Sequence, residues 1–442
     1  MNKSDSIDVA LSLEEHGYTR ASSVEEADLI ILNTCSVREH AVERIIGRLG
    51  YCRTLSSKSD GDIVIVLAGC MAQEQGRRIM ELFPEIKVIA GTYHFLDIPR
   101  LVERYYRSGV PVVADDMEEY CFSTYRGLRA EGHRAWVNII TGCSNYCSYC
   151  IVPYLRGREI SKNSAEVLRE ISELVHRGVV EVTLLGHNVN AYGRDSGDIS
   201  FGELLERIND IEGLRWIRFL TSHPRDFNPD LVKRISRLKK VCRHFHLPLQ
   251  SGSDRILCLM NRGYTMSHYR SVVDAIREYM PDAAVTTDIL VGFPSESEEE
   301  FSKTLKAVES IGFDDAFTYR YSKRPFTHAA NSDEQVPQEV AGRRLAELIS
   351  LQRTISLKKN LEEVGKQVTL LVERKSKKNS SEFLCRSEKN KVVVVPTEKP
   401  VGSFIEARIE EISGNTLRGL EVELNMDRTP ASVKPPGAVS CS

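Results

Sequence analysis

Short apolar runs and amphipathic helical stretches alternate through residues 130–360 of this 442-residue chain, and this alternation constrains the fold more than any other feature. Six runs are typical of strands: Ala135–Thr141, Val180–Leu185, Trp216–Thr221, His244–Leu249, Val285–Val291 and Asp315–Tyr321. The helical stretches between them include Ser164–His176, Gly202–Ile211, Ser267–Tyr279 and Glu298–Ile311. This spacing predicts a parallel β/α barrel, full or partial, over residues 129–361, with a long charged helix at Gln335–Leu361 as its exit.

Residues 1–125 show a shorter alternation of the same kind after a helix that opens near Ser4. Three runs are apolar on both faces, as buried parallel strands are: Asp28–Thr34, Asp62–Ala68 and Ile86–Gly91. A βα unit normally supplies a strand before its first helix. We therefore expect a parallel α/β domain that lacks its first strand, with a truncated amino terminus or a misassigned start.

Residues 362–425 change character to short strand-like runs with turn residues between them. These runs are Gln367–Val372, Glu382–Arg386, Lys391–Val395, Ser403–Ile412 and Thr416–Glu423. Such a pattern predicts a small β-barrel of the kind that binds oligonucleotides. Residues 426–442 are rich in proline, and we expect them to be disordered.

Composition limits the classes of protein to which this α/β chain can belong. Hydrophobic residues make up 41% and charged residues 27%, as in soluble globular proteins. No apolar run is long enough for a membrane helix, and residues 1–17 lack a signal core, so we expect a cytoplasmic location. The net charge of −3 requires any nucleic-acid contact to come from a local patch, for which Glu373–Lys391, with seven Lys or Arg against three Glu, is the candidate.

The sequence GCSNYCSYC places Cys143, Cys147 and Cys150 in a C-x3-C-x2-C spacing directly after the first barrel strand. A short loop of this kind can bind three irons of a cubane cluster and leave the fourth iron open to a small molecule. A zinc knuckle without a nearby fourth ligand and a cluster of free thiols are the alternatives. Active sites of β/α barrels lie at the carboxyl ends of the strands, which favours catalysis.

Two further cysteines, Cys35 and Cys70, directly follow the first two strands expected in the amino-terminal domain. Ligand sites of open α/β sheets lie at the carboxyl ends of strands. In a reducing compartment such cysteines are better interpreted as metal ligands or free thiols than as disulfides.

Several stretches resemble the radical-SAM methylthiotransferases, and among these most closely the MiaB-type tRNA 2-methylthio-N6-isopentenyladenosine synthases. The stretches are LNTCSVREHA, AGCMAQE, GCSNYCSYCIVPYLRGRE, TLLGHNVNAYG, TSHPRDF, HLPLQSGSDRIL, LMNRGYT and TTDILVGFPSES. The resemblance implies that Cys143, Cys147 and Cys150 bind a catalytic [4Fe–4S] cluster, which cleaves S-adenosylmethionine to a 5′-deoxyadenosyl radical. It further implies an amino-terminal domain with an auxiliary [4Fe–4S] cluster and an RNA-binding TRAM domain.

The implied reaction inserts a methylthio group at carbon 2 of N6-isopentenyladenosine, at position 37 beside the tRNA anticodon. Sister families act on threonylcarbamoyladenosine in tRNA or on a ribosomal protein. The implied partners are tRNA and an electron donor such as flavodoxin or ferredoxin, with no membrane, and the implied state is a monomer. Gly186 and Asn188 would contact the methionyl amino group, although a tight turn explains them as well, and Gln250 and Ser251 would face the cofactor.

One departure from the family concerns the auxiliary cluster. The family uses three cysteines there, and this sequence offers Cys35 and Cys70; the third would lie two residues before Met1. Cys52 could substitute, but a free thiol is the better interpretation. Three hypotheses remain: a two-cluster methylthiotransferase, a truncated radical-SAM protein that cannot insert sulfur, and a non-enzymatic RNA-binding iron–sulfur protein.

Overall fold

A computed structural model describes residues 2–36, 39–56, 63–118, 120, 122, 130–377, 379 and 381–422. The chain divides into two compact units, Met1–Lys359 and Asn360–Ser442. Within the described ranges, no helix is long and apolar enough to cross a membrane. The tail expected to be disordered, residues 426–442, lies outside them.

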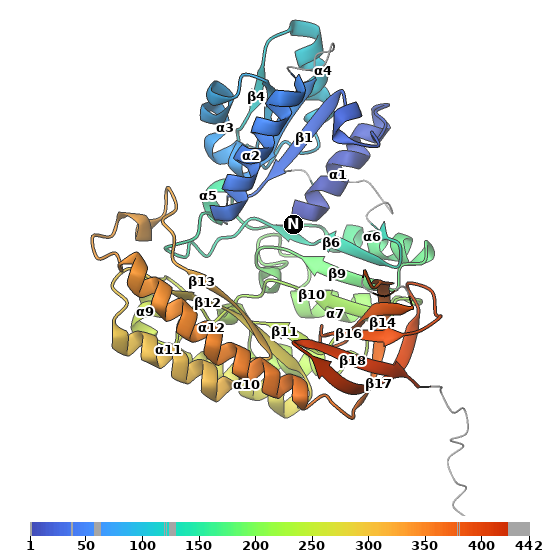
Figure 1. The fold of residues 1–442 in the computed structure, drawn as a ribbon, viewed down its shortest axis with the longest axis vertical. Helices are drawn as coiled ribbons and strands as arrows, with labels where there is room; N and C mark the ends of the chain where they lie inside the picture. Colours follow the sequence, from blue (N-terminus) through green and yellow to red (C-terminus); the bar gives the residue numbers. More distant parts are fainter. Residues whose placement is uncertain are drawn as a thin grey trace, which may run out of the picture. The chain divides into compact units, whose positions relative to one another are not determined.

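The first part of unit 1 is a parallel sheet in the order β1–β2–β3–β4, of which Figure 1 labels β1 and β4. Its strands are β1 (Leu29–Thr34), β2 (Val64–Gly69), β3 (Ile86–Ala90) and β4 (Val112–Ala114). Its helices are α1 (Asn2–Glu15), α2 (Glu39–Ser56), α3 (Cys70–Leu82) and α4 (Ile98–Ser108). The three strands expected from the sequence are confirmed, whereas β4 is too short and too close to a proline for its pattern to indicate a strand.

Both faces of this sheet are covered by helices, as its continuous apolar strands require. Ile65 and Leu67 of β2 pack with α2 and α3. Val64 and Val66 of the same strand pack with α1 and α4 on the opposite face. Successive side chains of a strand point to opposite faces, so a strand buried on both sides must be apolar throughout, and β2 is buried at every position.

The second part of unit 1 is a partial β/α barrel of parallel strands. They are β6 (Arg134–Asn138), β9 (Glu181–Leu185), β10 (Trp216–Phe219), β11 (His244–His246), β12 (Ala284–Val291) and β13 (Asp315–Arg320). Between β10 and β11, the amide of Ile217 donates to the Lys240 carbonyl at 2.7 Å, which continues the curved sheet. Among the described residues the ladder ends on β5 (Ala130–Glu131) at one edge and on β13 at the other, so the barrel is open.

Helices cover the outside of these strands (Figure 1). They are α6 (Ser164–His176), α7 (Phe201–Asn209), α8 (Pro229–Ser236), α9 (Asp254–Leu259), α10 (Met266–Tyr279) and α11 (Glu298–Ile311), and α12 (Gln338–Leu361) follows the last strand. Several begin where the sequence favours a start, such as the capping boxes Ser200–Glu203 of α7 and Ser297–Glu300 of α11. Two short strands, β7 (Ile140–Thr141) and β8 (Ile160–Ser161), bracket α5 (Val152–Arg156).

Unit 2 contains a closed β-barrel in the order β14–β15–β16–β18–β17. Its strands are β14 (Gln367–Lys375), β15 (Glu382–Ser387), β16 (Val392–Pro396), β17 (Phe404–Ser413) and β18 (Thr416–Glu421). Alternate residues of each strand point inward to an apolar core that includes Cys385 and Phe383. The fold class expected from the sequence, α/β with a partial barrel and a small carboxyl-terminal β-barrel, is confirmed.

The basic stretch expected on this β-barrel is only partly available to a ligand. Arg386 is paired with Glu373, and Lys389 with Glu363 at 2.8 Å. Among the described residues of the stretch, the exposed cations are Arg374, Lys375 and Lys377, on β14 and the turn that follows it. Any phosphate contact from this stretch would therefore come first from the end of β14.

Candidate functional site

The loop that carries three cysteines begins at the end of β7 and is closed by its own backbone. Gly142 has a φ of +69°, and a Cβ atom there would collide with the carbonyl group of Arg158, so the residue must be glycine. The Cys143 amide donates to the Gly157 carbonyl at 3.0 Å. The Cys150 amide donates to the Cys147 carbonyl at 2.9 Å. The three cysteines are therefore held on one compact loop at the carboxyl end of the first barrel strand.

The environment of Cys143 and Cys150 disfavours a thiolate that has no cation. Cys143 and Cys147 are buried and Cys150 is half-buried. Burial raises the pKa of Cys143 and that of Cys150 to about 12, and neighbouring thiols add to both shifts. A positively charged metal centre would be needed to hold the Cys143 and Cys150 thiols deprotonated in so dry a place.

The donor set of the loop fits a cubane cluster. In the part of the chain that the structure describes, no three His, Cys, Asp or Glu side chains converge as the ligands of one metal ion do. Structural zinc takes four ligands around one point, whereas a [4Fe–4S] cluster binds each thiolate through a different iron. The loop GCSNYCSYC supplies three thiols and no fourth Cys or His, which leaves one iron for a small molecule.

Arg262 lies beside this loop, in the turn between α9 and α10. Its Nη1 donates to the Cys147 sulfur at 3.3 Å, and its Nη2 donates to the Pro248 carbonyl at 3.1 Å. The side chain is buried, and its guanidinium lies over the Tyr264 ring at 5.4 Å. Arg262 is not among the residues predicted from the sequence, where its only signal is an arginine within the stretch LMNRGYT.

Gly186 and Asn188 follow β9 directly. A Cβ atom at Gly186 would collide with the Ile140 side chain, so glycine permits β7 to approach the end of β9. Asn188 is fully buried, and its Nδ2 donates to the Asp226 carboxylate at 2.7 Å. Its Oδ1 has no hydrogen-bond partner among the residues described. An unused acceptor at the end of a barrel strand suits a ligand that carries an amino group.

Gln250 and Ser251 lie after β11 and differ in their surroundings. Gln250 has a φ of +69°, and its amide donates to the Asp288 carbonyl at 2.8 Å. Such strain in a residue other than glycine concentrates at functional sites. Ser251 is fully buried, and its hydroxyl accepts from the Ser253 amide at 3.2 Å and lies 3.4 Å from the Thr304 hydroxyl. The Ser251 hydroxyl is thus engaged within the protein.

Cys35 and Cys70 lie at the carboxyl edge of the amino-terminal sheet. The parallel register of β1 and β2 places Thr34 opposite Gly69, so the next residues, Cys35 and Cys70, are neighbours. Burial raises the pKa of Cys70; the Arg156 guanidinium opposes this shift and Cys35 adds to it. The structure therefore brings together Cys35 and Cys70, the two thiols that were predicted from the sequence as metal ligands of this domain.

Cys52 lies elsewhere in this domain. It is on α2 and packs in the apolar core with Leu49 and Leu67. Burial raises the pKa of its thiol. This environment is that of a free core thiol and not of a metal ligand.

Arg156 and Asp5 form a buried ion pair next to Cys70. Arg156 ends α5, directly after the cysteine loop, and its Nη2 donates to the Asp5 carboxylate of α1 at 2.8 Å. Burial disfavours the charge of Asp5, but Arg156 outweighs this effect and lowers the pKa of the carboxyl group below its ordinary value. This partner, distant in sequence, removes the Arg156 guanidinium from water.

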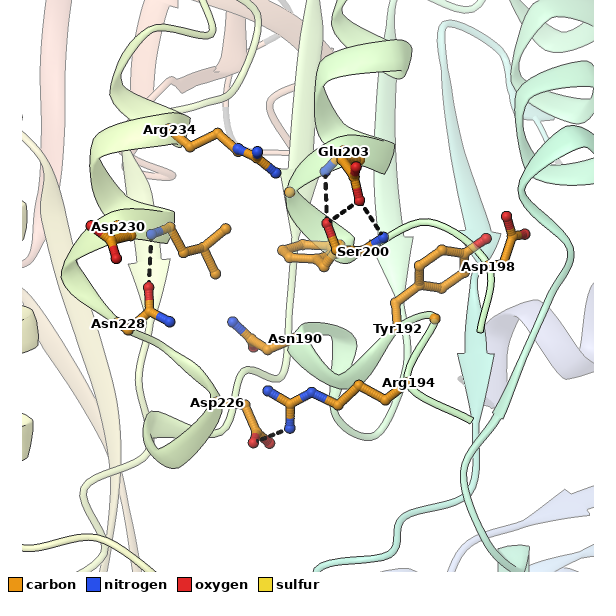
Figure 2. A pocket seen from close by; sticks show the side chains of 14 residues that line it. Asn190, Tyr192, Arg194, Asp198, Ser200, Glu203, Asp226, Asn228, Asp230 and Arg234 are labelled. Carbon is orange, nitrogen blue, oxygen red and sulfur yellow. Dashed lines mark hydrogen bonds and ion pairs between the residues drawn. The ribbon is translucent and has the colours of Figure 1, made fainter. Parts of the chain in front are cut away.

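A cavity of about 480 Å³ lies beside Asp226, at the amino ends of α7 and α8 (Figure 2). Asn190 is turned toward its centre in Figure 2, and neither polar atom of that buried amide has a partner among the described residues. The charged groups in the lining are Arg194, Arg234, Asp198, Glu203, Asp226 and Asp230. Carboxylates outnumber guanidinium groups, so the cavity does not suit a phosphate.

Three family models match successive parts of the chain. The family model described as "Radical SAM superfamily" matches residues 137–308. "Uncharacterized protein family UPF0004" matches residues 1–91, and "TRAM domain" matches residues 361–420. The radical SAM superfamily implies a [4Fe–4S] cluster and S-adenosylmethionine as cofactors.

A solved structure supports the fold assignment. The radical S-adenosylmethionine methyltransferase TsrM from Kitasatospora setae covers 73% of this chain and 70% of its own, with a TM-score of 0.54 and 14% identity. At this identity the likeness concerns the fold alone.

Curated relatives match nearly the whole chain. The "tRNA-2-methylthio-N(6)-dimethylallyladenosine synthase" of Dictyoglomus thermophilum is 45% identical over 96% of this chain and 97% of its own. The protein of the same name from Moorella thermoacetica is 44% identical over 96% of both chains. The chain therefore belongs to the family of the tRNA-2-methylthio-N(6)-dimethylallyladenosine synthases, within the radical SAM superfamily.

Proposed function

We propose that this chain is a radical-SAM tRNA methylthiotransferase that inserts a methylthio group at carbon 2 of N6-isopentenyladenosine, at position 37 beside the anticodon. The isopentenyl group is the dimethylallyl group in the names of the relatives. The single observation that carries the proposal is the 44–45% identity over 96% of the chain with curated synthases of this name.

Cys143, Cys147 and Cys150 would hold the catalytic [4Fe–4S] cluster. Their support is a loop of three thiols at the carboxyl end of a barrel strand, with no fourth protein ligand in the loop. When bound, the cluster supplies the electron that cleaves S-adenosylmethionine and so generates the radical chemistry of the superfamily. The protein contributes a dry site, because the loop packs against Gly157 and Met260 through backbone hydrogen bonds.

The residues at the strand ends would bind S-adenosylmethionine. The free Oδ1 of Asn188 would accept a hydrogen bond from the methionyl amino group, with Asp226 orienting the amide through Nδ2. Gly186 lets the Ile140 side chain of β7 lie against this strand end, where any larger residue would collide with it. Gln250 and Ser251 would shape the opposite side, Gln250 through its strained backbone and Ser251 by holding the turn at Ser253.

Cys35 and Cys70 would provide two ligands of an auxiliary [4Fe–4S] cluster concerned with sulfur donation. Their adjacency at the ends of β1 and β2 supports this role, and Arg156 beside Cys70 offers a positive charge to an anionic cluster. Cys52 would not provide the third ligand, because its side chain packs in the apolar core of the domain.

The division of labour would follow the three parts of the chain. Residues 1–125 would carry the auxiliary cluster, residues 129–361 the radical site, and residues 362–425 the RNA-binding TRAM domain, with tRNA as the substrate. The remaining partner would be an electron donor such as flavodoxin or ferredoxin, and the protein would act as a monomer in the cytoplasm.

The test is a reaction of the anaerobically reconstituted protein with tRNA that carries isopentenyladenosine, analysed by mass spectrometry of nucleosides. The expected product is 2-methylthio-N6-isopentenyladenosine, together with 5′-deoxyadenosine from S-adenosylmethionine. A tRNA that carries threonylcarbamoyladenosine tests the sister activity. Formation of 5′-deoxyadenosine with neither methylthiolated product would support the sulfur-deficient alternative and overturn the proposed transfer.

A further inference from the structure

Arg262 is anchored by several elements, and one of its nitrogens is directed at a proposed cluster ligand. Its Nη1 donates to the Cys147 sulfur at 3.3 Å and lies 3.4 Å from the Tyr149 hydroxyl. Its Nη2 donates to the Pro248 carbonyl at 3.1 Å. The Tyr264 hydroxyl lies 3.5 Å from Nε, and the Tyr264 ring lies beneath the guanidinium. The guanidinium therefore has little freedom to turn away from Cys147.

The turn that carries Arg262 also holds the cysteine loop in place. The Ser148 amide donates to the Met260 carbonyl at 3.0 Å, and the Ser148 hydroxyl donates to the Leu259 carbonyl at 2.7 Å. Asn261, with a φ of +55°, donates through Nδ2 to the Tyr146 carbonyl at 2.9 Å. Arg262 and Cys147 thus belong to one hydrogen-bonded assembly, although they are 115 positions apart in sequence.

Among the described residues, no carboxylate pairs with Arg262, which distinguishes it from the other buried arginines. Other buried arginines of the described chain are each paired with a buried carboxylate: Arg156 with Asp5 at 2.8 Å, Arg218 with Glu181 at 2.7 Å, and Arg344 with Glu296 at 2.8 Å. The partners of Arg262 in this structure are a thiol, two phenols and a carbonyl group. A buried charge without a counterion is strongly unfavourable, so this site calls for an anion.

We propose that Arg262 is a positioning residue for the radical-SAM cluster: it donates a hydrogen bond from Nη1 to the Cys147 thiolate and provides the counterion of the anionic cluster. This inference rests on the proposed function, in which Cys147 is a cluster ligand. A cation and a hydrogen-bond donor at a ligand sulfur stabilise the reduced, more negative cluster more than the oxidised one. Arg262 therefore raises the reduction potential and makes the one-electron reduction by an external donor easier.

The test compares Arg262→Lys, Arg262→Gln and Arg262→Met in the full-length chain, reconstituted anaerobically. Cys35→Ala and Cys70→Ala are included in every protein, the reference included, so that the paramagnetic signal comes from the radical-SAM cluster alone. The readout is a redox titration with dithionite and mediators, followed by electron paramagnetic resonance. Iron content and thermal unfolding are measured on the same samples.

The expected result is a lower potential in Arg262→Met and Arg262→Gln, with the equilibrium constant of one-electron reduction at least about tenfold smaller, or about 59 mV. Arg262→Lys keeps the charge and should restore most of the potential. Arg270→Met is the matched control, because Arg270 is an exposed arginine of α10 that donates to Ser310 and does not touch the loop. Its potential should equal that of the reference.

Equal potentials in the reference, the Gln variant and the Met variant, with normal iron content, would overturn the inference. If Arg262→Met binds no iron, the potentials of Arg262→Lys and Arg262→Gln decide, because these two side chains differ mainly in charge. Equal potentials in these two variants would then overturn the inference. Failure of the proposed function is distinguishable: Cys147→Ala would then retain its four irons, whatever the potentials of the Arg262 variants.

Discussion

Arg156 and Asp5 form an ion pair of 2.8 Å in which the side chains are only 2% and 3% exposed, and this pair joins α1 to the segment that follows the cysteine loop. The two residues are 151 positions apart. Because the same guanidinium acts electrostatically on Cys70 and on His187, the pair links the proposed auxiliary site to the end of β9. Burial and the charge of Arg156 lower the pKa of His187 to about 3, so this histidine is neutral at physiological pH.

Replacing one member of this pair should destabilise unit 1 strongly. Asp5→Asn leaves Arg156 as a buried charge without its counterion, and we expect a loss of about 3–5 kcal/mol in the free energy of unfolding. The double variant Asp5→Asn with Arg156→Met should lose less than the sum of the two single variants. Glu14→Gln is the control, since Glu14 pairs with Arg20 in solvent and should cost less than about 1 kcal/mol. Urea unfolding of the native protein, the two single variants and the double variant measures the coupling between Asp5 and Arg156. Additive losses would contradict this coupling.

The strands and the cysteine loop could be predicted because their signals are local. The apolar run Val285–Val291 lies within β12, and the cysteine motif occupies nine consecutive residues. Parallel strands end at one edge, so the position of Cys70 beside Cys35 also followed from the order of the elements. In each case the information lay within a single element or in the sequence of elements.

The pairings that complete the site could not be predicted, because they depend on tertiary packing. Nothing near Asp5 in the sequence distinguishes it from the other acids of α1, and its partner Arg156 is identified only by the folded chain. The same holds for Arg262 and Cys147. The hydrogen bond from Asn188 to Asp226 likewise joins residues of two neighbouring βα units.

The three cysteines of the loop should be individually necessary for one cluster. Cys143→Ala, Cys147→Ala and Cys150→Ala should each lower the iron content by about four atoms per chain after anaerobic reconstitution, because each thiolate binds a separate iron. Cys258→Ala, which removes an exposed thiol of α9, should leave the iron content unchanged. Iron and sulfide analysis measures the effect. Full iron content in all three loop variants would refute the ligand assignment.

Asn188 should control the affinity for S-adenosylmethionine. Asn188→Ala removes the free Oδ1, and we expect the dissociation constant to rise about tenfold, which is about 1.4 kcal/mol. Asn188→Asp should be worse, because a second carboxylate would face Asp226 at the position of the present 2.7 Å hydrogen bond. Equilibrium dialysis with the reconstituted protein measures both. Asn163→Ala, which removes the cap of α6, is the control and should bind normally; an Asp variant that binds as tightly as the native protein would exclude the role.

Glu300 should contribute to stability in a pH-dependent way. The hydrogen bonds from Arg255, against some desolvation, lower the pKa of Glu300 to about 2. A carboxyl group with a depressed folded-state pKa stabilises the fold above its unfolded-state pKa of about 4.3, and this stability is lost as the pH falls toward 2. Its size is at most about 3 kcal/mol, and screening reduces it because Arg255 is half exposed.

Urea unfolding of Glu300→Gln at pH 7 and at pH 3 tests this expectation. The variant should be less stable than the native protein at pH 7, and the difference should shrink at pH 3, because there the unfolded chain binds a proton at Glu300 while the native carboxylate remains largely ionised. Glu309→Gln, on the exposed side of the same helix, should show no difference at either pH. A difference that stays constant with pH would indicate that packing, and not charge, explains the role of Glu300.

Gly142 should be irreplaceable for a reason beyond its backbone conformation. Gly109 has nearly the same φ, +64° against +69°, but a Cβ atom there would meet nothing within 4 Å. Gly109→Ala should therefore cost only the strain of a left-handed alanine, about 1–2 kcal/mol. Gly142→Ala adds a collision with the Arg158 carbonyl, so the cysteine loop must move away from the segment that follows α5. We expect Gly142→Ala to lose the radical-SAM cluster while Gly109→Ala retains it, as measured by iron content in soluble, folded protein. Retention of the cluster in Gly142→Ala would mean that the loop can be displaced without separating its thiols.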